Sequence, residues 1–110
     1  MGLDNFWILP GQQPHPNFNP PLNLCGGMFS SHGQESFRGK VYASFCEEAM
    51  GINLYKDSLS NEELLNANLN LSKWLETQST WETLSKQEIL DVQRMFNKYA
   101  SLGATLESWY

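Results

Sequence analysis

The segment with the clearest potential for chemistry runs from Cys25 to Lys40 and reads CGGMFSSHGQESFRGK. It holds four glycines, three serines, one histidine, one arginine and one lysine. Glycine allows backbone amides to converge on an anion, and hydroxyl, guanidinium and ammonium groups all donate hydrogen bonds to phosphate oxygens. The composition of this segment therefore predicts a site for a phosphate-bearing ligand.

Each residue type in this segment has a role in the predicted site. We expect Arg38 and Lys40 to neutralise phosphate. His32 or Phe37 would contact a nucleobase. If Ser36 caps a helix, the free amides and the positive dipole end of its first turn also favour an anion. The remaining hydrogen-bond donors are the serine hydroxyls and the amides around the glycines, namely Ser30, Ser31, Ser36, Gly26, Gly27 and Gly33.

The spacing within the segment matches neither of two common phosphate-binding motifs. A Walker A loop follows the pattern GxxxxGK with a serine or threonine next, whereas five residues separate Gly33 from Gly39. Val41 follows Lys40, and the glycines also lack the GxGxxG spacing. In the alternative interpretation, the glycines form turns and Arg38 pairs with a carboxylate of the helical part. Cations at a helix start oppose its dipole, which favours an anionic ligand beside them.

Nucleophilic catalysis is a competing interpretation of the same segment. Cys25 could serve as the nucleophile with His32 as the base, which would make the protein a small hydrolase. Ser30 and Ser31 are further candidate nucleophiles. The two histidines and two cysteines of the chain lack the spacing of a zinc site. We therefore expect no metal and no cofactor.

The composition limits the classes of protein to which the chain can belong. With 110 residues the chain has the size of one domain, so residues 1–110 are expected to form a single domain. Hydrophobic residues make up 41% and charged residues 17%, which predicts a folded chain. The formal net charge is -5, which disfavours a surface that neutralises many phosphates. We expect no binding of extended nucleic acid.

The sequence also indicates a compartment. No segment approaches the ~20 apolar residues that span a bilayer. The first residues lack the basic and apolar regions of a signal peptide. Cys25 and Cys46 are too few for a disulfide framework. We therefore expect a cytoplasmic protein, in the host cell if the protein is viral, with no membrane partner.

The elements that must position the predicted site divide the chain near residue 38. All five prolines lie between Pro10 and Pro21, which predicts an irregular strap and a glycine-rich loop over residues 1–37. In residues 38–110, apolar residues recur with a helical period, and capping-box spacings begin at Ser60 and Ser85. The sequence therefore predicts an α+β, predominantly α fold with about three helices, at residues 38–50, 61–77 and 86–101.

Several apolar side chains lie outside the predicted helices, which cannot cover all of them, so we expect a homo-oligomer. The leading interpretation of function is a non-enzymatic protein that captures a phosphate-bearing small ligand such as a nucleotide. A phage-type accessory protein that sequesters a defence signal would have these properties. One alternative is a protein-interaction module, an inhibitor or adaptor, that acts through its acidic helices and its apolar strap, including Trp7 and Phe18. The other alternative is the small hydrolase.

Overall fold

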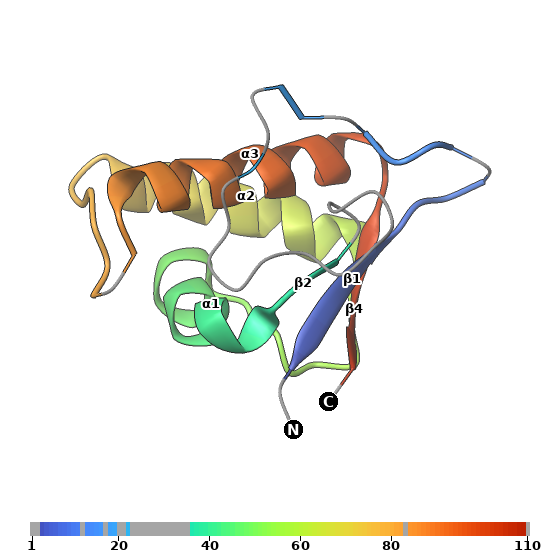
Figure 1. The fold of residues 1–110 in the computed structure, drawn as a ribbon, viewed down its shortest axis with the longest axis horizontal. Helices are drawn as coiled ribbons and strands as arrows, with labels where there is room; N and C mark the ends of the chain where they lie inside the picture. Colours follow the sequence, from blue (N-terminus) through green and yellow to red (C-terminus); the bar gives the residue numbers. More distant parts are fainter. Residues whose placement is uncertain are drawn as a thin grey trace.

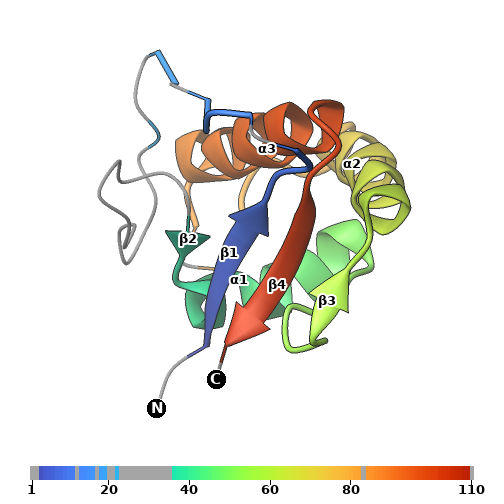
Figure 2. The same ribbon diagram turned by 90° about the vertical axis from the view of Figure 1, so that its right-hand side faces the viewer.

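The described residues form a four-stranded antiparallel sheet with helices on one of its faces (Figures 1 and 2). The computed structural model describes residues 3–11, 13–16, 18–19, 22, 36–82 and 84–109. The elements in chain order are β1 (Asp4–Ile8), β2 (Ser36–Phe37), α1 (Gly39–Phe45), the π-helical turn η1 (Cys46–Met50), β3 (Ser58–Leu59), α2 (Asn61–Leu75), α3 (Lys86–Ser101) and β4 (Thr105–Trp109). The strand order is β2-β1-β4-β3, so β1 and β4 form the centre of the sheet.

The predicted helices and the α+β class are confirmed. The helix α3 has the predicted bounds, and α2 ends at Leu75, two residues before its predicted end. The first predicted helix begins at Gly39, and its second half is the π-helical turn that ends at Met50. Gly51 then adopts a left-handed C-cap with a φ of 71°, a conformation that glycine tolerates without strain. Within the described ranges, no helix is long and apolar enough to cross a membrane.

Both long helices begin with a capping box. In α2 the Ser60 hydroxyl accepts a hydrogen bond from the Glu63 amide at 3.2 Å, and the Glu63 carboxylate accepts one from the Ser60 amide at 3.1 Å. Ser85 and Glu88 repeat this arrangement at the start of α3. Lys56 also donates to the Glu63 carboxylate, and these bonds hold the pKa of Glu63 below its ordinary value. The capping boxes satisfy amides that a helix start otherwise leaves without a partner.

Removal of either cap should destabilise the protein by about 1 kcal/mol. We expect this loss for Ser60→Ala and for Ser85→Ala, because each removes the hydroxyl that accepts from a first-turn amide. Ser72→Ala is the matched control, since Ser72 is exposed within α2 and alanine is the better helix former there. Urea unfolding followed by far-UV circular dichroism measures all three variants. Equal stability of Ser60→Ala and Ser72→Ala would contradict the contribution of the cap.

The predicted strap is not irregular throughout, because it contains two strands. β1 pairs with β4 along its whole length, and β2 adds a short strand on its other side, where Phe37 lies opposite Asn5. The partner β4 lies at the other end of the chain, so no local spacing indicates this pairing. Beyond β1, the described apolar strap residues pack against the protein, since Leu9, Phe18 and Leu22 are partly buried against the core.

The core lies between the sheet and the helices and is rich in aromatic rings. Trp7 points inward from β1 and is 2% exposed. Its ring stacks on Tyr99 of α3 at a centroid distance of 4.5 Å and meets Phe96 edge to face at 5.0 Å. Phe37 of β2 lies 6.0 Å from both Trp7 and Phe96, again measured between ring centroids. Rings from three elements therefore hold the sheet against α3.

Candidate functional site

Most of the predicted phosphate site lies outside the described residues. This holds for Gly26, Gly27, Ser30, Ser31, His32 and Gly33, and for Cys25 of the predicted hydrolase. Their roles stay predictions. The structure describes the other four members of the predicted site, which are Ser36, Phe37, Arg38 and Lys40.

These four residues lie at the junction of β2 and α1. Ser36 belongs to β2, and the N-cap of α1 is Arg38, which makes no side-chain capping bond. The predicted cap by Ser36 is therefore wrong, because the chain is still paired in the sheet at that position. Arg38 and Lys40 are both exposed, and the Lys40 amide donates to the Leu3 carbonyl at 3.2 Å.

Phe37 has a core role instead of the predicted contact with a nucleobase. Its side chain is 0% exposed. The ring faces Trp7, Tyr42 and Phe96. Successive side chains of a strand point to opposite faces, so the pairing of β2 with β1 turns Phe37 inward when Ser36 points outward. A ligand on the surface does not reach this ring.

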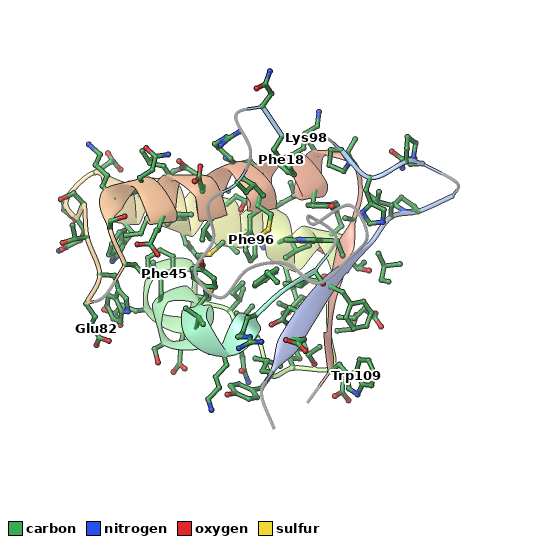
Figure 3. The ribbon with its side chains drawn as sticks, in the orientation of Figure 1. Phe18, Phe45, Glu82, Phe96, Lys98 and Trp109 are labelled. Atoms are coloured by element: carbon green, nitrogen blue, oxygen red, sulfur yellow. The ribbon has the colours of Figure 1, made fainter. Side chains whose placement is uncertain are left out.

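A groove between the strap and α3 contains a different set of polar and charged groups. Figure 3 labels two of its lining residues, Phe18 of the strap and Lys98 of α3. Its volume is about 520 Å³, and its lining consists of Phe18, Asn19, Arg94, Asn97 and Lys98. Arg94 and Lys98 are four residues apart in α3, so their side chains lie on the same side of the helix. Among the described lining residues there are two cations, two amides and one ring, and no carboxylate. This set suits an anion that carries an apolar or planar group.

Arg94 is oriented by an ion pair and by a ring. Its Nη1 donates to Asp91 Oδ1 at 2.8 Å. Its guanidinium carbon lies 5.9 Å from the centre of the Phe18 ring. Asp91 is 2% exposed and also accepts a hydrogen bond from Gln87 at 3.4 Å. The guanidinium is planar, so the ion pair and the ring contact together fix its orientation.

The strap that carries Phe18 is attached to the end of α3 by hydrogen bonds. His15 Nδ1 forms one with the Tyr99 hydroxyl at 3.0 Å. Gln13 Nε2 donates to the Leu102 carbonyl at 3.2 Å. The Phe18 ring lies 6.3 Å from the ring of Tyr99, which is itself buried in the core. The wall of the groove that Phe18 forms is therefore connected to the core.

The described thiol is part of the core. Cys46 is 0% exposed, and burial raises the pKa of its thiol well above the ordinary value. A thiol that stays protonated is a poor nucleophile, so Cys46 is not a catalytic candidate. Within the described part of the chain, no group of three His, Cys, Asp or Glu side chains could hold a metal ion.

Sequence spacing indicates only one wall of the groove. Arg94 and Lys98 fall on one face of the helix predicted at residues 86–101. The other wall depends on Phe18 and Asn19, and no spacing in the sequence shows where the strap crosses α3. Comparisons of the chain with known protein families, with curated proteins and with solved structures gave no match.

Proposed function

We propose that this protein is a non-catalytic binding protein that captures a phosphate-bearing small ligand, such as a nucleotide, in the groove between the strap and α3. The observation that supports the proposal is the joint placement of Arg94 and Lys98 beside Phe18 in an open groove of about 520 Å³. The volume lies in the range of small-molecule sites, and the groove is open to solvent on one side. Asp91 balances the charge of Arg94, so Lys98 is the cation of the described lining that forms no ion pair with a described carboxylate, in a chain of net charge -5.

The groove offers a complementary group for each part of such a ligand. A phosphate oxygen would accept a charge-assisted hydrogen bond from Lys98, which is stronger than a bond between neutral groups, and the Arg94 guanidinium lines the same groove. The amides of Asn19 and Asn97 both donate and accept, as the polar edge of a base or sugar requires. Phe18 supplies an apolar wall. Because Arg94 is already held by its ion pair and its ring contact, it loses little side-chain freedom on binding.

The glycine-rich segment stays a second predicted location for the same ligand. Arg38 is the N-cap of α1, and Lys40 lies in the first turn of that helix. The groove is formed by α3 and the strap, so different substitutions test the two locations. The cellular role that we propose for either location is sequestration of a signalling nucleotide by a phage-type accessory protein.

Titration calorimetry with ADP, pyrophosphate and adenosine should show binding of the two phosphate compounds and no binding of adenosine. Lys98→Gln should weaken ADP binding about tenfold, which corresponds to about 1.4 kcal/mol and to the loss of one charge-assisted bond. Lys86→Gln is the matched control, because Lys86 is an exposed lysine of α3 outside the lining of the groove. This control should bind ADP as the unmodified protein does.

Two outcomes would change the proposal. If Arg38→Gln weakens ADP binding and Lys98→Gln does not, the ligand binds in the glycine-rich segment. If neither ADP nor pyrophosphate binds at millimolar concentration, capture of a phosphate-bearing ligand is the wrong function.

Docking of a protein partner is a second candidate function, and a different surface favours it. Trp7, which the sequence placed on the docking strap, is a core residue, and Phe18 is partly buried against the core. The sheet instead exposes large apolar side chains, since Trp109 is 74% exposed and Ile8 is 44% exposed. We therefore propose that a partner would dock on the sheet rather than on the strap and the acidic helices.

A further inference from the structure

The face of the sheet opposite the helices, here called the outer face, presents side chains from both central strands. Successive side chains of β1 and β4 point to opposite faces of the sheet. Asn5, Trp7 and Leu106 point toward the core, and the residues next to them in each strand point outward. Figure 2 shows that none of the helices drawn in the described ranges covers this face. Trp109 projects from β4 away from the helices (Figure 3).

The register of β1 and β4 arranges four outward side chains as a checkerboard of acids and rings. Asp4 lies directly opposite Trp109, and Phe6 lies directly opposite Glu107. Opposed residues of an antiparallel pair have Cβ atoms about 5 Å apart, and residues two apart on one strand share a face. Each carboxylate therefore borders one ring across the strands and the other ring along its own strand. We call these four residues the acid–aromatic face.

A hollow of about 300 Å³ opens on the acid–aromatic face. It is lined by Asp4, Phe6, Ser36 and Trp109. Two rings, a carboxylate and a hydroxyl thus border the same space. A guanidinium stacks on aromatic rings and forms parallel hydrogen bonds with a carboxylate, so this lining matches an arginine side chain.

The charge of the face favours a cationic partner. Asp4 and Glu107 take part in neither of the ion pairs formed between described residues. The other outward strand residues are neutral, and Arg38 follows β2 at the edge of the face. A second copy of this chain would bring the same two carboxylates against this face, and like charges in such an interface are repulsive. A partner that carries arginine is complementary, and a second copy is not.

We propose that the acid–aromatic face binds a segment of a protein partner through an arginine that enters the hollow between Phe6 and Trp109. Apolar neighbours of that arginine pack against Ile8, which continues the outer face of β1. This proposal rests on the docking function, because it specifies the partner chemistry for the sheet surface. It does not involve the groove on α3.

The test uses the full chain and two capped hexapeptides that differ only in charge. One contains two leucines and two arginines, and in the other both arginines are replaced by citrulline, which has a similar shape and no charge. In an NMR titration of the 15N-labelled protein, the arginine peptide should shift the amide signals of β1 and β4. It should bind about tenfold more tightly than the citrulline peptide.

Substitutions on the acid–aromatic face test separately how much the Trp109 ring and the two carboxylates contribute to peptide binding. Trp109→Ala should weaken binding of the arginine peptide about tenfold, and so should the double variant Asp4→Asn, Glu107→Gln. The matched control is the double variant Glu62→Gln, Glu76→Gln, which removes two exposed carboxylates at the ends of α2. This control should bind the arginine peptide as the unmodified protein does.

Four results would overturn the proposal. They are equal affinity for the two peptides, no shift of the β1 and β4 signals at millimolar peptide, equal weakening by the control double variant, and a dimer of the unmodified protein that Trp109→Ala dissociates. The third result would mean unspecific attraction to an acidic protein, and the fourth would assign the face to a second copy. ADP binding that persists in the Trp109→Ala variant would show that the groove acts separately.

Discussion

Replacement of Trp7 by alanine should lower the free energy of unfolding by about 3–5 kcal/mol, the range measured for truncation of buried large aromatic residues. Trp7 stacks on Tyr99 and meets Phe96 edge to face. Its indole nitrogen is buried without a hydrogen-bond partner in the described structure, so the loss comes from packing and from the cavity left behind. Small domains have only about 5–15 kcal/mol of stability, so this loss would be a large fraction of the total.

Guanidinium chloride unfolding followed by circular dichroism measures this loss, and the neighbouring strand offers a matched control. Trp109→Ala makes the same chemical change on β4, but the side chain is 74% exposed, so its stability should change by about 0.5 kcal/mol or less. Trp7→Phe keeps a ring in the core and should fall between the two. A Trp7→Ala variant as stable as Trp109→Ala would contradict the core role of Trp7.

Gly39→Ala should destabilise the protein by about 2–4 kcal/mol, although alanine is the better helix former by about 1 kcal/mol. Gly39 is buried at the first turn of α1, and an added Cβ would overlap Asn5 Oδ1 and lie 2.9 Å from Asn5 Cγ. Asn5 has little room to move, because its Nδ2 donates to the Leu54 carbonyl at 3.0 Å in a buried position. The expected loss combines overpacking with damage to this hydrogen bond, and urea unfolding measures it.

A double-mutant cycle tests this mechanism. Asn5→Ala alone loses the buried hydrogen bond, but it also removes the atoms that the new Cβ would meet. The double variant Asn5→Ala, Gly39→Ala should therefore be less destabilised than the sum of the two single variants. Strict additivity would show that the close approach of Gly39 to Asn5 is not the cause.

The helices could be predicted from the sequence because their signals are local. Ser60 and Ser85 begin capping boxes, as the spacing predicts. The sheet could not be predicted, because its central strands come from opposite ends of the chain. In β1 the outward residues Phe6 and Ile8 are also apolar, so the alternation of polar and apolar residues that marks a half-buried strand is absent.

The candidate sites show the same limit. The four-residue spacing of Arg94 and Lys98 can be read from the sequence, but the crossing of Phe18 over α3 is a tertiary contact. The acid–aromatic face depends on the register that sets Asp4 opposite Trp109, and a shift by one residue would place these side chains on opposite faces.

The pairing of residues 4–8 with residues 105–109 joins two segments that are synthesised at different times. The central strand β1 is synthesised well before its hydrogen-bonding partner β4 and before α3, the helix that covers Trp7. Until then this apolar strand has an open edge, which is a feature that promotes association between nascent chains. The central pairing of the sheet therefore cannot form before β4 has been synthesised, so this fold depends on a contact between segments far apart in the sequence.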